Sequence, residues 1–332
     1  MVFSRSQLIS GTSWTLVGYV LSQIIRFGGN LILARILVPE IFGFMSLVYT
    51  LIQGMEMFSD LGLGPSIIQN QTGDDPKFLK TAWSFQLIRG AIIAFLACIL
   101  AYPVSLFYGE SLILYVLPVV GLNSLIASFN TPILFSLNRH LKMKSLVLFD
   151  LFTQIIGIIL AISFAYEHPT VWALVLATLV YCIIRLILGY LFFKGFKPSF
   201  GIDPEAKAEI FNYGKGIFFS TFLGYFSGQI DILSIGYLFS LTTLGIYSIS
   251  LNLAKAPLEI CRVLSTKIGF PWLSKVHREE GVDTERLFQM RSKIVIPFIA
   301  IEVLLVFISA PLIHFLYLAR HASKPRYPCH KQ

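Results

Sequence analysis

Nine long apolar segments constrain what this 332-residue chain can fold into more than any other feature of its sequence. A helix needs about 20 mainly apolar residues to cross the hydrocarbon core of a bilayer. The segments of this length are 8–34, 41–67, 80–103, 111–136, 145–166, 170–193, 211–237, 242–264 and 292–317. The sequence therefore predicts an all-α, polytopic membrane helix bundle with about nine transmembrane helices.

The composition supports a membrane protein. Charged residues make up only 13% of the chain, whereas soluble domains carry roughly 25%. Mean hydropathy is +0.74. The net charge of +8 would suggest nucleic-acid binding in a soluble protein, but most basic residues here fall in short loops between apolar segments. The four cysteines have no metal-ligand spacing and no phosphate-binding glycine loop occurs, so we expect neither a nucleic-acid partner nor a cofactor.

The loop charges alternate along the chain and predict its orientation. The first segment is preceded by Arg5, and every second loop is basic, whereas the loops between them carry almost no basic residues. The basic loops hold Lys77, Lys80, Arg139, Lys142, Lys144, Lys194, Lys197, Lys207, Lys215, Lys267, Lys275, Arg278, Arg286 and Arg291. Basic loops stay on the cytoplasmic side of a membrane. We therefore expect a cytoplasmic N-terminus.

A weak internal repeat relates the first two apolar segments to the seventh and eighth. The letters LARIL at 33–37 align with IGYLF at 235–239, and FGFMSL at 42–47 align with LGIYSI at 244–249. An alternative interpretation is that any two membrane hairpins look alike. Six helices separate the copies, an even number, so both hairpins run in the same direction across the membrane. This pattern is typical of transporters built from two parallel lobes.

The repeat predicts how the chain is divided. An N-terminal six-helix lobe would occupy 1–195, and a second lobe would start with three helices in 196–318. The polar tail 319–332 is basic although nine spans would place it outside, which breaks the charge alternation. It is either a short outer extension or a sign that the C-terminal part has been lost. Because a full second lobe needs three more helices, we favour an incomplete second lobe.

Several of these segments carry a resemblance to a known family. They are the Ser10-Gly11 opening, Leu33-Ala34-Arg35, the turn Pro39-Glu40-x-Phe42-Gly43, and Asp60-Leu61-Gly62 followed by Ser66-Ile67-Ile68-Gln69. Together they resemble the N-terminal signature of bacterial polysaccharide-transport proteins. These are the Wzx-type oligosaccharide flippases of the multidrug/oligosaccharidyl-lipid/polysaccharide (MOP) superfamily. The resemblance runs from the first helix to about residue 318 and implies a MATE/MOP-like two-lobe architecture, with more helices than the nine expected here.

The resemblance also implies a function. Such a protein is not an enzyme. It resides in the bacterial cytoplasmic membrane and flips a polyprenyl-diphosphate-linked oligosaccharide repeat unit to the outer leaflet by alternating access. The product serves lipopolysaccharide O-antigen, exopolysaccharide or capsule biosynthesis. The implied partners are the lipid-linked oligosaccharide and membrane lipids, with the polysaccharide polymerase machinery as a further candidate.

Cationic residues inside the apolar segments are candidates for binding the cargo. A diphosphate crossing a bilayer needs compensating charge, and arginine and lysine bind phosphate oxygens well. The candidates are Arg26, Arg89, Arg185 and Lys255. The alternative is that each pairs with a nearby acid or extends to the membrane surface. Polar residues within the segments could bind sugar hydroxyls or tie helices together; they include Gln23, Asn30, Gln53, Gln86, Asn123, Asn130, Gln154 and Gln229.

Acidic residues in the same segments are candidates for coupling transport to an ion. They are Glu56, Asp60, Asp231 and Glu302. Glu56 and Asp60 are four residues apart and share one helix face. Asp60 could instead cap a helix break, because the sequence Gly-Leu-Gly-Pro begins two residues after it, at Gly62.

Other functions fit parts of the sequence. A cation or drug antiporter of the same superfamily would share the architecture, but its site should be dominated by acids and aromatic residues. A membrane enzyme such as an O-antigen polymerase or ligase should present a large outer loop, and the outer loops here are short. A truncated, non-transporting product would explain the unusual tail.

Overall fold

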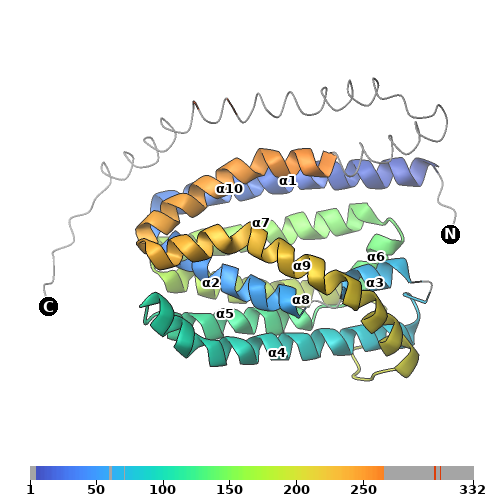
Figure 1. Ribbon diagram of the computed structural model, residues 1–332. Helices are drawn as coiled ribbons and strands as arrows, with labels where there is room; N and C mark the ends of the chain where they lie inside the picture. Colours follow the sequence, from blue (N-terminus) through green and yellow to red (C-terminus); the bar gives the residue numbers. More distant parts are fainter. Residues whose placement is uncertain (1–4, 60–61, 71, 265–302, 304–306, 308–332) are drawn as a thin grey trace, which may run out of the picture.

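The computed structural model describes residues 5–59, 62–70, 72–264, 303 and 307. Within residues 5–264 it consists of helices joined by short connections (Figure 1). Their bounds are α1 Arg5–Ile36, α2 Pro39–Phe58, α3 Leu63–Gln69, α4 Pro76–Tyr108, α5 Ile113–Ser128, α6 Ile133–Arg139, α7 Met143–Glu167, α8 Val171–Phe192, α9 Pro204–Leu238 and α10 Leu241–Leu264. The all-α fold class predicted from the sequence is confirmed for this part of the chain.

Proline and aspartate set the starts of three long helices. Pro39, Pro76 and Pro204 occupy the first helical position of α2, α4 and α9, where the missing N–H costs nothing and the fixed φ suits a helix. Asp75 accepts a hydrogen bond from the backbone N–H of Lys77, and Asp203 accepts one from Ala206. These caps satisfy backbone donors that the first turn of a helix leaves unpaired.

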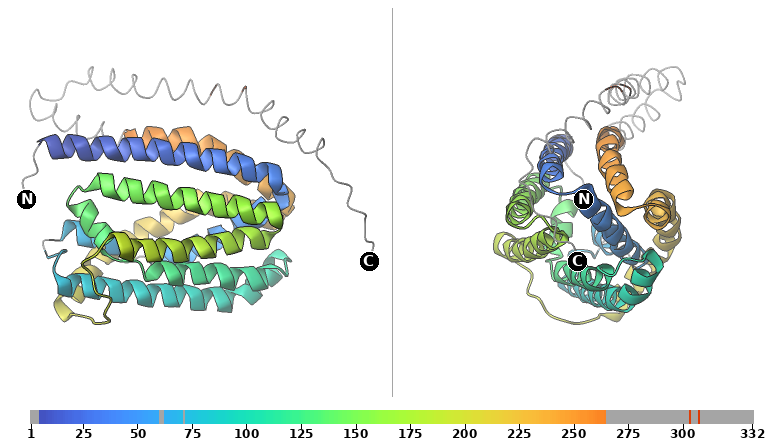
Figure 2. Two further views of the ribbon diagram at one scale, coloured as in Figure 1. Left: turned by 180° about the vertical axis from the view of Figure 1, so that it is seen from behind. Right: turned by 90° about the vertical axis from the view of Figure 1, so that its left-hand side faces the viewer.

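The long helices run nearly parallel to one another and are joined alternately at the two ends of the bundle (Figures 1 and 2). The α1–α2, α4–α5, α7–α8 and α9–α10 connections lie at one end. The α3–α4, α6–α7 and α8–α9 connections, which carry the basic residues Lys142 and Lys197, lie at the other. The two kinds of loop that the charge pattern distinguishes are thus separated in space, as the positive-inside rule requires.

α2 lies at the centre of the arrangement. It packs against α4, α5 and α8 on one side and against α9 and α10 on the other, while α1 packs on α7. The larger apolar core forms around α2 and includes Leu47, Val48, Ile113 and Leu117. A smaller core joins α3, α4 and the start of α9 through residues such as Phe78 and Ile210. The chain therefore buries its apolar surface around one central helix.

Five described helices are long and apolar enough to cross a membrane: α1 from Ser13, α2, α4, α7 and α8. A sixth span results if α5 and α6, which meet at a bend of 60°, are taken together. The expected spans 211–237 and 242–264 correspond to α9 and α10, which are more polar and fall outside that set. The ninth expected span, 292–317, and the tail 319–332 lie outside the described residues.

Two expected spans are broken helices. This corrects the continuous helix expected over 111–136, and over 41–67 it agrees with the alternative of a helix break after Asp60. The segment 41–67 is divided between α2 and α3, and 111–136 is divided between α5 and α6. At the first break Gly62 has a φ of 63°, a left-handed conformation that glycine adopts without strain. At the second break Pro132 immediately precedes α6, and proline cannot continue a hydrogen-bonded helix. The short helices α3 and α6 pack on each other, where Gly64 faces the ring of Phe135.

Candidate functional site

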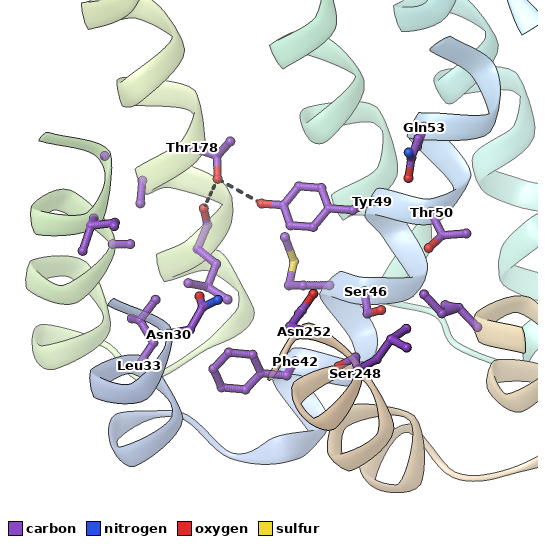
Figure 3. A pocket seen from close by; sticks show the side chains of 18 of the residues that line it. Asn30, Leu33, Phe42, Ser46, Tyr49, Thr50, Gln53, Thr178, Ser248 and Asn252 are labelled. Carbon is purple, nitrogen blue, oxygen red and sulfur yellow. Dashed lines mark hydrogen bonds between the residues drawn. The ribbon is translucent and has the colours of Figure 1, made fainter. Parts of the chain in front are cut away.

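A cavity of about 570 Å³ lies between six helices: α1, α2, α7, α8, α9 and α10 (Figure 3). Within the described residues it is the space where the expected N-terminal lobe meets the first helices of the expected second lobe. Its lining mixes apolar residues with hydroxyl and amide side chains, and we call it the central cavity.

Hydrogen bonds fix several polar side chains of the central cavity. The hydroxyls of Tyr49 on α2 and Thr178 on α8 are 3.0 Å apart, and Thr178 donates its hydrogen to the Leu174 carbonyl, so Tyr49 is the donor (Figure 3). Gln229 on α9 donates to the Gln53 side chain on α2 at 3.0 Å. These contacts link α2 across the cavity wall to the helices on both of its sides.

The described lining of the central cavity carries a single positive charge. Lys255 on α10 is the one charged side chain among the described residues that line it, and no acid is among them. The amides of Asn30, Gln53, Gln154, Gln229 and Asn252 contribute most of the remaining polarity. Such a lining can donate hydrogen bonds to hydroxyl groups and can attract one negative charge.

The internal repeat of the sequence reappears in the walls of the cavity. The alignment that places Gly43 opposite Gly245 also places Ser46, Thr50 and Gln53 of α2 opposite Ser248, Asn252 and Lys255 of α10. All six of these polar residues line the central cavity. Equivalent positions of two related hairpins thus face one space, and the single cation belongs to one hairpin only.

A second cavity, of about 360 Å³, contains the predicted residues Glu56 and Arg89. Arg89 on α4 donates to the Glu56 carbonyl at 2.8 Å and to the Ser59 hydroxyl at 3.2 Å, so its guanidinium lies at the C-terminal end of α2, where cations are favoured. The Glu56 carboxylate accepts a hydrogen bond from Ser124 at 2.7 Å. The structure therefore brings together these two predicted residues, one from each proposed class.

Gln86 extends the same face of α4 to a second helix end. Its side-chain N–H group donates to the carbonyl of Ser128 at 2.9 Å and approaches those of Ala127 and Asn130 at 3.4 Å. These carbonyls lie at the end of α5, beside the break before α6. One helix, α4, therefore caps the C-terminal ends of α2 and α5, where the two spans are interrupted.

Arg185 lies in a local ion pair. It donates to Asp150 at 2.7 Å and to the hydroxyls of Thr153 and Tyr181 at 3.1 Å, and it sits over the Phe149 ring. This arrangement joins α7 to α8 and matches the alternative of pairing with a nearby acid. Its predicted role in cargo binding stays a prediction.

The remaining predicted residues are dispersed. Arg26 is exposed on α1, four residues before the cavity residue Asn30. Asp231 on α9 accepts a hydrogen bond from the Tyr247 hydroxyl on α10. Asp60 and Glu302 lie outside the described residues. Among the residues that are described, no three His, Cys, Asp or Glu side chains gather where they could bind a metal ion.

The sequence did not single out Tyr49, Thr178, Tyr181 or Asn252, which all line the central cavity. Hydropathy does not tell whether a residue of a membrane helix faces lipid or a cavity. The repeat offered a usable signal, because aligning Gly43 with Gly245 places Thr50 at the position of Asn252.

Comparisons with known proteins agree on one family. The sequence profile described as "Polysaccharide biosynthesis protein" matches residues 32–323. The chain is 22% identical over 86% of its length to the teichuronic acid biosynthesis protein TuaB of Bacillus subtilis, and 20% identical over 85% to the lipopolysaccharide biosynthesis protein WzxC of Escherichia coli. It is 22% identical over 72% of its length to the succinoglycan biosynthesis transport protein ExoT of Rhizobium meliloti. These matches cover 59%, 57% and 47% of the relatives. No solved structure matches significantly.

Proposed function

Because this chain belongs to the polysaccharide biosynthesis protein family, we propose that it moves a polyprenyl-diphosphate-linked oligosaccharide across the bacterial cytoplasmic membrane. The chain is a multi-pass membrane protein, and relatives with this sequence pattern are named for teichuronic acid, lipopolysaccharide and succinoglycan biosynthesis. The exported unit would serve lipopolysaccharide, exopolysaccharide or capsule assembly. The N-terminus would lie in the cytoplasm.

The observation that carries this proposal is the lining of the central cavity. Amides and hydroxyls suit a cargo rich in hydroxyl groups, and Lys255 suits a cargo with a negative charge. A cation or drug antiporter of the same superfamily would need acidic side chains at its site. The described lining has none, and the oligosaccharide interpretation is therefore favoured.

The two hairpins that share this cavity suggest how transport would proceed. We assign α1–α8, within 1–195, to the first lobe and α9–α10 to the start of a second lobe within 196–318. Alternating access would then require the α1–α2 and α9–α10 hairpins to move relative to each other around the central cavity. Glu56 in the second cavity is the best-placed candidate for ion coupling, because it lies inside a spanning helix beside Ser124 and accepts its hydrogen bond.

Complementation tests the proposal. The 332-residue chain is expressed in cells that carry its native glycan cluster but lack their own flippase gene. Surface polysaccharide is resolved on a gel, and membrane insertion is measured in parallel. We expect long-chain polymer with the wild-type chain and with Lys197→Gln, an exposed control in the α8–α9 connection. A stably inserted wild-type chain that gives no polymer would overturn the proposal.

A further inference from the structure

The start of α9 is attached to α4 at the basic end of the bundle, which we define as the end that carries the α3–α4, α6–α7 and α8–α9 connections (Figure 1). The backbone N–H of Gly201 donates to the Ser84 hydroxyl at 2.9 Å, and that of Asp203 donates to the Thr81 hydroxyl at 2.9 Å. Both hydroxyl residues are fully buried. Breaking this attachment would take hydrogen bonds away from buried polar groups, which is costly.

Further contacts hold the first two turns of α9. Ile210 is fully buried in the smaller apolar core, and the rings of Phe211 and Phe85 meet edge to face with 5.6 Å between their centroids. The Glu209 carboxylate accepts a hydrogen bond at 3.3 Å from the Thr72 hydroxyl in the α3–α4 connection. The basic end of α9 is therefore joined to the preceding helices by hydrogen bonds as well as by apolar packing.

The opposite end of α9 meets α4 through exposed aromatic rings. Those of Tyr237 and Phe107 stack with centroids 4.6 Å apart and planes 20° apart, and 57% and 59% of the two residues are exposed. The Tyr108 hydroxyl approaches the Leu233 carbonyl at 3.5 Å, which is longer than a typical hydrogen bond. In a bilayer such rings can exchange their mutual contact for contacts with lipid tails, which are equally apolar.

The helix α10 is tied to α9 and would follow it. The Tyr247 hydroxyl on α10 donates to the Asp231 carboxylate on α9, and hydrogen bonds to charged groups are among the strongest in proteins. At the same end of the bundle α10 packs on α2 around Leu244 and at the crossing of Gly245 with Gly43. Apolar contacts of this kind can also be exchanged for lipid.

We propose that the α9–α10 hairpin tilts about a pivot, its attachment to Thr81 and Ser84, and that the Phe107–Tyr237 stack is a gate that opens at the opposite end. With its 35 residues, α9 is about 50 Å long. Because displacement grows with distance from the pivot, a tilt of about 6° moves Tyr237 by about 5 Å but Phe211 by only about 1 Å. The pivot can thus stay intact while the gate opens.

The same tilt would widen the central cavity. Gln229 lies between the two ends of α9 and donates to Gln53 on α2 at 3.0 Å. At its distance from the pivot, a tilt of this size displaces Gln229 by about 4 Å. This inference rests on the proposed function and deepens it, because the proposed orientation places the gate on the outer side, where alternating access must release the cargo.

Cysteine pairs at the two ends of α9 test the pivot and the gate. They are introduced into the 332-residue chain after its four native cysteines have been replaced by serine. Phe107→Cys/Tyr237→Cys spans the gate, and Thr72→Cys/Glu209→Cys is the matched pair beside the pivot, where both residues are exposed. A short, reducible bifunctional thiol reagent joins each pair in cells that lack their own flippase. Their native glycan cluster is then induced, and surface polysaccharide is resolved on a gel.

The two cross-links should have different effects on export. Joining the gate pair should lower surface polymer at least about tenfold, because each transport cycle requires the gate to open, and a reductant should restore it. Joining the pivot pair should leave export within about twofold of the untreated variant, because the two residues barely move. The single variants Phe107→Cys and Tyr237→Cys, treated with the same reagent, are controls for modification without a cross-link.

Spin-label distances test the tilt without relying on transport. Nitroxide labels are attached to the same two cysteine pairs in the purified full chain in lipid nanodiscs. The gate pair should show a second population of distances about 5 Å longer than the first, and the pivot pair should show a single population. This measurement also applies to a variant that inserts into the membrane but exports poorly.

Each contrary result has a distinct meaning. Undiminished export by the cross-linked gate pair, or a single distance at the gate, would overturn the gate. A pivot pair whose cross-link stops export, or that shows two distances, would overturn the pivot. In these cases the proposed function would stand. A wild-type chain that fails to complement would overturn the proposed function, whereas the spin-label distances would still decide whether the hairpin tilts.

Discussion

Gly43 and Gly245 pack backbone against backbone where α2 crosses α10. A Cβ atom on Gly43 would lie 2.0 Å from the Leu241 carbonyl oxygen, and one on Gly245 would lie 1.8 Å from that of Pro39. The contact is reciprocal, because each glycine faces the first turn of the other helix. These are the two glycines that the sequence repeat aligns, so the repeat marks a point of physical contact between its own two copies.

Alanine at either glycine should therefore destabilise the helix crossing. The obstructing atoms belong to the backbone and cannot rotate away, so Gly43→Ala and Gly245→Ala should each cost about 1–3 kcal/mol, as overpacking does. Gly28→Ala and Gly228→Ala are matched controls, because nothing lies within 4 Å of a Cβ atom at those positions. Thermal unfolding in detergent should show a lower Tm for the first pair only. Equal Tm values for all four variants would contradict the close contact.

Arg89→Ala should lower both stability and export. The guanidinium holds the end of α2 through the Glu56 carbonyl and the Ser59 hydroxyl, and hydrogen bonds to charged groups contribute about 1.5–3 kcal/mol. Arg89→Lys keeps the charge but not the planar set of donors. Lysine should thus restore export largely if the cargo requires a positive charge at this position, and only weakly if the two simultaneous hydrogen bonds of the guanidinium to Glu56 and Ser59 are required. Normal surface polysaccharide in Arg89→Ala would rule out an essential role for Arg89.

The Arg185–Asp150 pair can be tested by exchanging its charges. If Arg185 serves to join α7 to α8, Arg185→Asp and Asp150→Arg should each impair the protein, and the combined variant should recover. Double-mutant cycles on exposed pairs usually give a coupling of about 0.2–1 kcal/mol. Because Arg185 is half-buried while Asp150 is exposed, we expect a coupling toward the upper end of this range. Unfolding measures the coupling, and complementation measures export. A combined variant that is stable but exports nothing would instead favour a direct contact between Arg185 and the cargo.

The orientation of the bundle predicts which loops a membrane-impermeant thiol reagent reaches. Lys197, in the α8–α9 connection, and Glu110, in the α4–α5 connection, lie at opposite ends of the bundle. In a variant without its native cysteines, intact cells should label Glu110→Cys, and only permeabilised cells should label Lys197→Cys. The reverse pattern would mean that the positive-inside rule fails for this chain.

Much of the fold follows from hydropathy, and the exceptions have local causes. The expected spans 80–103, 145–166 and 170–193 agree with α4, α7 and α8 to within a few residues at most of their ends. The break after α2, where Gly62 stands, was one of two alternatives that the sequence offered for Asp60, whereas the break after α5, where Pro132 stands, was not predicted. Membrane helices tolerate glycine and proline in many places, so these residues alone do not tell a break from a continuous span. What distinguishes these two positions is tertiary: α3 and α6 pack on each other.

The site was predictable in part. Lys255 lines the central cavity, and Glu56 and Arg89 share the second cavity, while the roles of all three stay predictions. The cavity-facing positions of Asn252 and Tyr49 could not be predicted, because a polar side chain in an apolar segment can face lipid headgroups, a neighbouring helix or a cavity. Only the packing of six helices decides among these, and that information is distributed over residues far apart in the sequence.

The two caps supplied by α4 have a mechanical consequence. Arg89 and Gln86, both on α4, donate hydrogen bonds to the ends of α2 and α5. The helices α2, α4 and α5 are therefore joined at these ends as well as by packing along their lengths. Helices joined in this way would resist sliding past one another. Movement would then occur at helix contacts where fewer side chains interlock. At the glycine crossing of α2 and α10 no side chain separates the two backbones, so a small sliding of one helix past the other would meet no side-chain obstacle there. The helices α2, α4 and α5 would then form the rigid unit relative to which the α9–α10 hairpin moves.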